Sequence, residues 1–485
     1  MITILEASKI KEIINKDFNS RAKTAARVGQ RYYEGKHDIL NYKIYYYTGG
    51  ENGTEGKLVE DKTRSNIKIP HQFFTELVDQ CVHYLLSGSD NGIVTSDDPQ
   101  LHEYLGEYFD DEFIDELADV LTDVCVNGFG SMYAYMTADE RIKFTYADSM
   151  GVVEVMAKDT DDSTDYVIYW YIDRVDDNKV IKRIQVWDSV QTTYFCQVND
   201  GAVELDKSEA VNPRPHIVYT KPDEEGTFGS EFGFIPFFRM DSSRKQTSHL
   251  APVKALIDDY DLMACGLSNN LQDIADGIYV VKGFEGDSLD TLQQNIKNKK
   301  IVGLPENGDV EIRTISIPYE ARKVKLELDE KNIYHFGMGF NPSQLGDGNI
   351  TNVVIKSRYT LLELKSKKLE GKLRAFLKKL IQVALDEINR KHETDYRMKD
   401  VKINLKRELI TNELDNAQIA LTKAQTQQAE INILLSVAAT LGDENIIEKI
   451  CEVLDIDYDE IKDKLPDEGG LNAAQGTLKQ VTVDE

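Results

Sequence analysis

The chain has 485 residues, of which 41% are hydrophobic and 29% are charged, a balance typical of globular proteins and unlike that of a disordered chain. It carries 84 acidic against 57 basic side chains, which gives a formal net charge of -27. This surplus of acid argues against a protein that simply wraps nucleic acid, because such proteins are usually basic, so any contact with DNA must be local or must avoid adhesion.

The cysteines and histidines form no recognisable local motif. There is no CxxC pair, and the eight histidines stand singly, without an HxH, HExxH or Cys/His cluster. The pattern favours small buried thiols in a reducing compartment, and no metal site or cofactor is predicted. The first residues lack the apolar stretch of a signal peptide, and no run is long enough to span a membrane, so a soluble protein made in a cytoplasm is expected. The five cysteines are Cys81, Cys125, Cys196, Cys265 and Cys451.

The N-terminal part of the chain is predicted to be helical. Residues 6–35 are expected to form one helix, with Gly35 at the position of a C-terminal cap. The segment 43–66 is polar and rich in glycine, which predicts an exposed loop. Apolar residues recur every three or four positions after Pro70 and again over about 111–127, and this spacing predicts two further helices.

From Phe129 to about Arg239, short runs rich in Val, Ile, Tyr and Phe alternate with turn-like clusters. This pattern predicts an antiparallel β meander. The run YVIYWYI (Tyr166–Ile172) is apolar throughout and predicts a strand that is buried on both faces.

A helix, a small insert and a second helix follow. Residues 252–278 are expected to form a helix, with Pro252 in its first turn and Ser248 or a neighbour as the cap. Residues 279–318 resemble a small α/β hairpin unit, and a second helix is expected over about 319–336.

The last part begins with FNPSQLGDGNITN (Phe340–Asn352), a polar loop that runs into a long, Lys-rich helix over about 353–389. The alternation in VKINLKREL (Val401–Leu409) predicts a strand. Two or three short helices are expected over 411–464, and the tail 465–485 has no core pattern.

The segments that most resemble phosphate-binding or calcium-binding loops lack essential residues of those motifs. GGENGTEGKL (Gly49–Leu58) fails as a phosphate loop, because Glu51 stands where its first glycine belongs and Leu58 replaces the Ser or Thr that holds Mg²⁺. DTDDSTD (Asp159–Asp165) fails as a calcium loop, because Thr164 and Trp170 occupy its glycine and glutamate positions. No nuclease or Ser-His-Asp arrangement has a local signature. No enzymatic activity is therefore predicted.

Several segments taken together resemble the portal proteins of tailed bacteriophages, in particular the SPP1-like family. The resemblance rests on YYEGKHDIL, GFGSMYAYM, the run LIDDYDLMACGLSNNLQDIADGIYVVKG and the segment NPSQLGDGNITNVVIKSRY, and it covers roughly residues 20–460. One departure is that many relatives have Ser-Gly-x-Ala-Leu after the loop, whereas Thr351–Ile355 stands here.

The resemblance implies an α+β portal fold with a helical stem, an α/β wing, a small α/β clip and a helical crown. It also implies a ring of about twelve subunits around a DNA channel. Carried over in chain order, the regions are 1–245 (wing), 246–278 (first stem helix), 279–318 (clip), 319–338 (second stem helix), 339–352 (tunnel loop), 353–410 (wing), 411–464 (crown) and 465–485 (mobile tail).

The same resemblance suggests candidate site residues. The tunnel loop would bring Gln344, Leu345, Asp347, Asn349 and Asn352 nearest the DNA. An acidic channel face, or else an ordinary solvated face, would contain Asp258, Asp261, Asp273 and Asp276. The basic helix would contact DNA or, as we favour, acids of a neighbouring subunit through Lys356, Arg358, Lys365, Lys368 and Lys372. Docking of the packaging motor or an adaptor at the clip, or else a solvated charge run, is assigned to Lys297, Lys299 and Lys300.

The function predicted from the resemblance is that of a head-tail connector in the virion, assembled in the bacterial host cytoplasm. It would conduct double-stranded DNA during genome packaging and ejection, without catalysis. Its partners would be further copies of itself, DNA, the terminase large subunit, a head-completion adaptor, and the major capsid and scaffolding proteins, with no membrane. The alternatives are another phage head or adaptor protein, against which the helix–insert–helix pattern argues, and a nucleic-acid-processing enzyme, against which the missing motifs argue.

Overall fold

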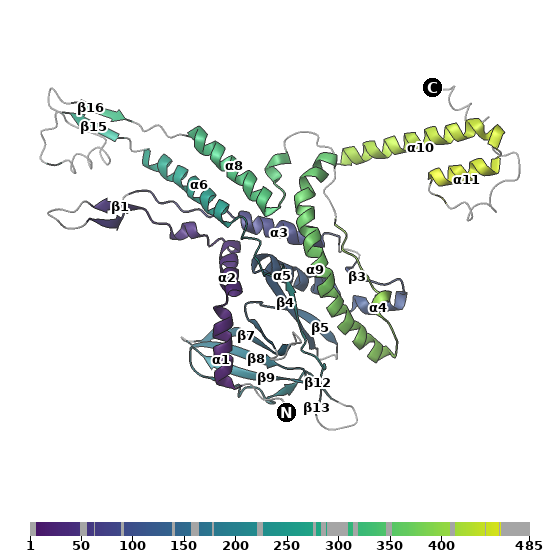
Figure 1. Ribbon diagram of the computed structural model, residues 1–485, viewed down its shortest axis with the longest axis horizontal. Coiled ribbons are helices and arrows are strands. Elements are labelled where there is room, and N and C mark those ends of the chain that lie inside the picture. Colours follow the sequence, from purple (N-terminus) through teal and green to yellow (C-terminus); the bar gives the residue numbers. More distant parts are fainter. Residues whose placement is uncertain are drawn as a thin grey trace. The chain divides into compact units, whose positions relative to one another are not determined.

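The computed structural model describes residues 6–48, 56–62, 64–88, 92–137, 141–156, 164–176, 179–220, 227–274, 278–282, 288, 309–313, 319–345, 352–407, 413–441, 443–454 and 456. The chain divides into two compact units. The core unit comprises residues 1–344 and 359–408, and the second unit comprises 345–358 and 409–485. Helices are mixed with antiparallel sheets, in agreement with the α+β class (Figure 1).

Two helices, and not the single one predicted, occupy the N-terminal segment: α1 (Ala7–Phe18) and α2 (Arg21–Tyr33). The break lies at Ser20, whose hydroxyl accepts a hydrogen bond from the backbone N–H of Lys23 and so caps the second helix. Gly35 follows α2 with φ +72°, which confirms its predicted capping role. A short 3₁₀ helix, η1, spans Asp38–Asn41.

The predicted polar loop contains a β-hairpin. β1 (Tyr45–Thr48) pairs antiparallel with β2 (Lys57–Glu60). These two stretches are therefore extended strands, where an irregular loop was expected. Beyond it, the two predicted helices are confirmed as α3 (Phe73–Leu86) and α5 (Asp111–Val126). The sequence reading missed the short elements between them, which are β3 (Val94–Thr95) and α4 (Pro99–Gly106).

The predicted meander is confirmed and folds into separate antiparallel sheets. One sheet has the order β14-β4-β5, from Phe237–Asp241, Phe129–Met136 and Ile142–Ala147. The larger sheet has the order β10-β9-β8-β7-β6, from Val203–Leu205, Gln191–Val198, Lys179–Trp187, Thr164–Asp176 and Val152–Met156. β11 (Arg214–Pro215) also pairs with β9, and β12 (Ile217–Thr220) pairs with β13 (Thr227–Ser230).

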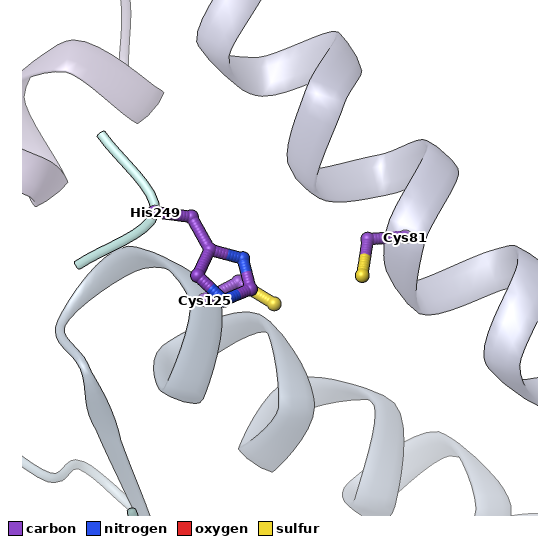
Figure 2. A group of neighbouring side chains, drawn as sticks. All are labelled: Cys81, Cys125 and His249. Carbon is purple, nitrogen blue, oxygen red and sulfur yellow. The ribbon is translucent and has the colours of Figure 1, made fainter. Parts of the chain in front are cut away.

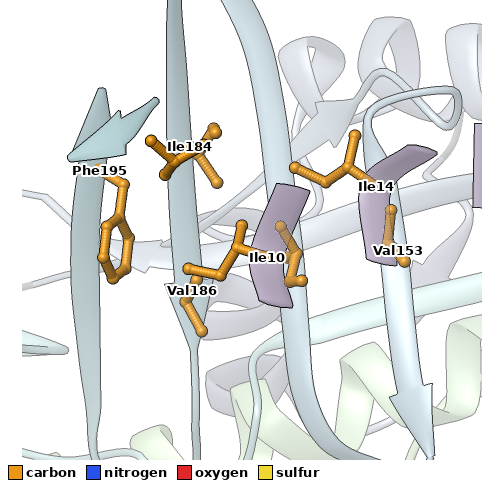
Figure 3. Packing of buried hydrophobic residues seen from close by; sticks show 8 residues of the cluster. Ile10, Ile14, Val153, Ile184, Val186 and Phe195 are labelled. Atoms are coloured by element: carbon orange, nitrogen blue, oxygen red, sulfur yellow. The ribbon is translucent and has the colours of Figure 1, made fainter. Parts of the chain in front are cut away.

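The larger sheet is covered on one face by α1. Ile10 and Ile14 of this helix pack against Val153, Ile184 and Phe195 (Figure 3). In β7, Ile168 belongs to this cluster, whereas its neighbour Val167 packs with Trp187 on the opposite face. The prediction that this strand is buried on both faces is therefore right at Val167 and Ile168, but Ile172 further along is 56% exposed.

The helix–insert–helix pattern is also confirmed. α6 (Lys254–Ile274) leads to β15 (Ile278–Lys282), which pairs antiparallel with β16 (Asp309–Arg313), and α8 (Tyr319–Gly337) returns beside α6 (Figure 1). α6 begins two residues after Pro252, which lies in a turn, and the Ser248 hydroxyl accepts a hydrogen bond from the backbone N–H of Leu250 at 3.1 Å.

The chain continues through η3 (Pro342–Leu345) into the long helix α9 (Asn352–His392), close to its predicted extent. The predicted strand over 401–409 shrinks to β17 (Lys402–Ile403), which pairs with β3 after the 3₁₀ helix η4 (Met398–Asp400). Where the structure describes the range 411–464, it contains one long helix, α10 (Glu413–Leu441), and one short helix, α11 (Asp443–Leu454), which pack together. None of the helices described is both long and apolar enough to span a bilayer.

Candidate functional site

The two helices of the hairpin are joined by an ion pair across their contact. Lys325 on α8 donates to Asp259 on α6 at 2.5 Å and also to Asp329 on its own helix. These hydrogen bonds raise the pKa of Lys325, so its charge is retained. Asp329 is buried, and the lysine satisfies its charge. α6 and α8 are thereby fixed as a pair.

Asp261 lies at the junction between α6 and the N-terminal segments. Its carboxylate is fully buried and accepts from Nδ1 of His37 at 2.7 Å, Nδ1 of His71 at 2.8 Å and the backbone N–H of His71 at 2.9 Å. Burial by itself raises the pKa of Asp261, but these donors outweigh it and lower the pKa below its ordinary value. Asp261 therefore cannot belong to an exposed acidic face, and its prediction as such is wrong, because its side of α6 packs against the segments that carry the two histidines.

The other acids predicted on this face differ in their surroundings. Asp258 accepts from Lys254 at 2.7 Å and from the hydroxyl of Tyr32, and Lys254 also donates to Asp38 at 2.7 Å. Burial and the contact with Asp258 raise the pKa of Tyr32 to about 12. Asp273 is exposed and accepts from the backbone N–H of Ser65 at 3.1 Å. Asp276 lies outside the described residues.

The chain that enters the predicted tunnel loop is held firmly on α3. The Gln80 side chain donates to the carbonyl of Phe340 at 2.8 Å and accepts from the N–H of the same residue at 2.9 Å. The Phe340 ring stacks on Tyr359 with centroids 4.5 Å apart, and Tyr334 donates to Glu76 at 2.5 Å. Met338 adopts a positive φ of 54°, which reverses the chain just after α8.

The predicted loop residues are only partly described. Gln344 and Leu345 end η3, while Asp347 and Asn349 lie outside the described residues. Asn352 is not exposed in the loop, contrary to the prediction, because it begins α9, is buried and donates to the side chain of Asn416 at 2.8 Å.

α9 is tied to the following segment by Arg407. Its guanidinium binds both carboxylate oxygens of Glu363, at 2.7 and 2.9 Å, and one oxygen of Glu370 at 2.7 Å. The hydrogen bond from Arg407 is the main reason that the pKa of Glu363 is lowered. Tyr84 of α3 donates to the same Glu363 at 2.8 Å. α3, α9 and the segment after β17 thus share one network.

The predicted basic residues of α9 differ in their exposure and in their contacts. Lys365 is half-buried and donates to the carbonyl of Gly337 at 3.0 Å. Lys356 is exposed and Arg358 is half-buried, both in the first turns of the helix. Lys368 and Lys372 are exposed, as are three further lysines of α9 that were not among the predicted site residues. None of these five lysines has an ion-pair partner among the described residues; they are Lys367, Lys368, Lys372, Lys378 and Lys379. Lys297, Lys299 and Lys300 lie outside the described residues.

Sequence reasoning missed the residues that position the loop. Gln80 and Glu76 act on segments about 260 positions away, and Arg407 acts on α9 from beyond it. No local spacing signals such contacts, because side chains on α3 reach the end of α8 only once the core has formed. In the sequence, Gln80 stands out only as a polar residue about two turns into a largely apolar helix.

These features describe a helical hairpin whose two helices are joined by an ion pair, and a long helix, α9, that is tied to α3 and to Arg407. The chain belongs to the phage portal proteins: the family described as "Phage portal protein, SPP1 Gp6-like" matches residues 11–457. Two relatives bear the same name, portal protein. That of Clostridium phage phiCD119 is 25% identical over 448 residues, covering 86% of this chain and 89% of its own. That of Bacillus phage SPP1 is 22% identical over 353 residues, covering 72% and 67% respectively.

Proposed function

We propose that this chain forms a ring-shaped homo-oligomer at one vertex of a phage capsid, through which double-stranded DNA enters during packaging and leaves during ejection. Its role is structural: it conducts DNA and provides a docking surface for the terminase large subunit, a head-completion adaptor, and capsid and scaffolding proteins. Membership of the portal family supports this role.

The observation that supports assembly most directly is the apolar surface of the helical hairpin. Val324 on α8 is 61% exposed and Leu271 on α6 is 57% exposed, although each helix already packs against the other. Further exposed apolar side chains on these helices are Leu262, Leu328 and Phe336. Val324 and Leu328 lie one turn apart on α8, and exposed apolar residues grouped in this way are typical of surfaces that are covered in an assembly. In a ring, the neighbouring copies of the hairpin would cover them.

Within such a ring, DNA must slide without being held. We assign contact with the passing duplex to the loop residues Gln344, Leu345, Asp347 and Asn349, because this set has no cation to hold phosphates: the amides bind them weakly and the carboxylate repels them. An acidic surface repels the duplex and keeps it mobile. We assign this surface to Asp273 and Asp276, on or just after α6, and in smaller part to Asp258, whose charge is balanced by Lys254. Lys297, Lys299 and Lys300 are assigned to docking of the terminase or adaptor.

The region boundaries follow the same proposal. The hairpin helices α6 and α8 are the stem, the β15–β16 pair belongs to the clip over 279–318, and α10 and α11 form the crown over 411–464. The remaining segments, 1–245 and 353–410, form the wing.

Electron microscopy of the purified protein in negative stain tests the proposal. Rings of about twelve copies with a central channel are expected. A compact monomer with nuclease or ATPase activity would contradict it and favour an enzyme. A small adaptor-like assembly that binds to preformed rings of another protein would favour a different head component.

A second experiment tests the loop assignment. Asp347→Ala and Asn349→Ala are expected to alter DNA packaging while rings assemble normally, because the loop is assigned to the channel and not to the subunit contact. Asp110→Ala serves as the control, since it removes the hydrogen bond to the backbone N–H of Phe113 at the start of α5, far along the chain from the loop. Equal damage to packaging and assembly by the loop variants would contradict the tunnel-loop role.

A further inference from the structure

Three soft donor groups from distant parts of the chain meet inside the core unit. Cys81 lies on α3, Cys125 lies on α5 and His249 lies in the turn that precedes α6 (Figure 2). The two sulfur atoms and an imidazole nitrogen lie within 4.8 Å of one another. Figure 2 shows the three side chains facing one another across the space between the two helices. Both cysteines are fully buried.

The backbone of His249 is fixed by a hydrogen bond, whereas one nitrogen of its imidazole ring has no hydrogen-bond partner among the described residues. Its backbone N–H donates to the carbonyl of Cys125 at 2.9 Å, which fixes the residue beside that thiol. Its Nδ1 atom is buried and has no hydrogen-bond partner in the part of the chain that the structure describes. A buried polar atom without a partner is rare and calls for an explanation such as a bound ion.

The residue types fit metal ligation, because thiolate sulfur and neutral imidazole nitrogen are ligands that zinc prefers.

The donor separations are close to those of a tetrahedral centre. Zinc–sulfur bonds of about 2.3 Å place two ligating sulfurs about 3.8 Å apart. The observed upper limit of 4.8 Å therefore requires the donors to approach by no more than about 1 Å, which side-chain rotation supplies.

The site also has a path to solvent. His249 lines a pocket of about 370 Å³, with Lys365, Lys368, Ser248 and Met338 among its other lining residues. An ion can enter through this pocket, and a water molecule from it can complete the coordination, since three protein ligands leave a fourth position open. Two thiolates balance the charge of a divalent ion, so the filled centre is neutral and its burial carries no net charge penalty.

We propose that Cys81, Cys125 and His249 bind one zinc ion, which links α3, α5 and the turn before α6. Binding releases the two thiol protons to solvent and leaves the imidazole neutral. The ion stabilises the base of the first stem helix, in agreement with the structural role proposed above, although the site does not depend on ring formation or on DNA.

The test uses the full-length protein, stripped of metal by a chelator and then titrated with Zn²⁺ or Co²⁺. We expect one ion per chain, a rise of several degrees in melting temperature with Zn²⁺, and, with Co²⁺, the charge-transfer absorption of thiolate ligation with the intense visible bands of a tetrahedral centre. Cys81→Ser and His249→Gln are each expected to weaken Zn²⁺ affinity by about tenfold or more.

Cys265→Ser is the matched control, because Cys265 is also a buried free cysteine of the core unit but lies outside the cluster. It should bind Zn²⁺ like the unmodified chain. Absence of thiolate absorption with Co²⁺ in the unmodified chain overturns the proposal even if the variants fail to fold. A Cys81–Cys125 disulfide that persists under reducing conditions, or equal loss of affinity in the Cys265 control, also overturns it. Failure of the chain to form rings would overturn the proposed function alone.

Discussion

Asp261 shows how a single buried carboxylate can hold distant segments together. It joins α6 to His37, which follows α2, and to His71, which precedes α3. A charged group that is withdrawn from water is tolerated only when it is hydrogen-bonded, and this one accepts three hydrogen bonds. Removing it leaves donors on two segments without an acceptor.

We expect Asp261→Asn to lower the free energy of unfolding by about 3 kcal/mol, because one partner of a buried network is lost while the others remain. Since the folded pKa of Asp261 lies below its unfolded value, its contribution is fully present above pH ~4 and is lost as the pH falls through the lower, folded pKa. Urea unfolding between about pH 7 and about pH 3, a range that spans the ordinary pKa of a carboxyl group, measures both effects. An Asp261→Asn variant with the stability and the acid sensitivity of the unmodified chain would contradict this prediction, whereas the exposed control Asp200→Asn should change neither.

Gln80 controls the entry to the polar loop through its paired hydrogen bonds with the backbone of Phe340. We expect Gln80→Ala to accelerate hydrogen exchange of the Phe340 amide by about tenfold. The reason is that the Phe340 N–H loses its acceptor, and a hydrogen bond contributes about 1 kcal/mol of net stability. Mass spectrometry of exchanged peptides over 338–344 measures the effect. Gln382→Ala on α9, which removes only an exposed contact with Asp386, is the control and should leave these peptides unchanged.

At the scale of elements, α9 combines a buried side with an exposed basic side. Leu362, Leu369, Leu373, Phe376 and Leu380 are buried along one side of the helix. The five exposed lysines that have no ion-pair partner in the described chain lie on the opposite side, in two rows. Gly371 and Ala375 lie between the rows, and a Cβ added at Gly371 meets nothing within 4 Å. We expect this surface to contact acidic side chains of a neighbouring copy.

We expect the double variant Lys372→Glu and Lys379→Glu to raise the protein concentration needed for ring assembly by about tenfold or more, because like charges then face one another across the subunit contact. Analytical ultracentrifugation at low and high salt measures the shift, which salt should reduce. The control Lys207→Glu and Lys399→Glu changes the net charge equally at exposed lysines elsewhere in the core unit. Normal assembly combined with a packaging defect would instead favour contact between α9 and DNA.

At the scale of the whole molecule, the net charge of -27 is expected to disfavour binding to DNA. We expect the chain to bind linear duplex DNA more weakly than the ~10⁻⁴ M typical of non-specific binding at physiological salt, because its overall field repels phosphates. Fluorescence anisotropy with a labelled duplex measures this. A dissociation constant in the micromolar range that rises steeply with salt would contradict the prediction.

The order of elements and the family could be predicted from the sequence because both depend on local pattern. Apolar spacing located α3, α5, α9 and the first hairpin helix, α6, and alternation located the meander. Boundaries were less certain: Ser20 interrupts a periodic segment by capping a new helix, and the tyrosine-rich strand Tyr45–Thr48 pairs with Lys57–Glu60 where glycines indicated a loop. In both places specific hydrogen bonds outweighed the average pattern.

The sequence by itself determined the acidic character of the chain, the alternation of helix and sheet, and the resemblance to portal proteins. Only the tertiary structure decided which polar residues face solvent and which meet inside. Asp261 lies on α6 among acids that helical spacing predicts to be exposed, yet it is buried against two histidines. Cys81, Cys125 and His249 come together from positions far apart in the chain. The reason is physical: helical periodicity specifies which residues share a face, whereas the partner of that face depends on packing between segments that no local spacing encodes.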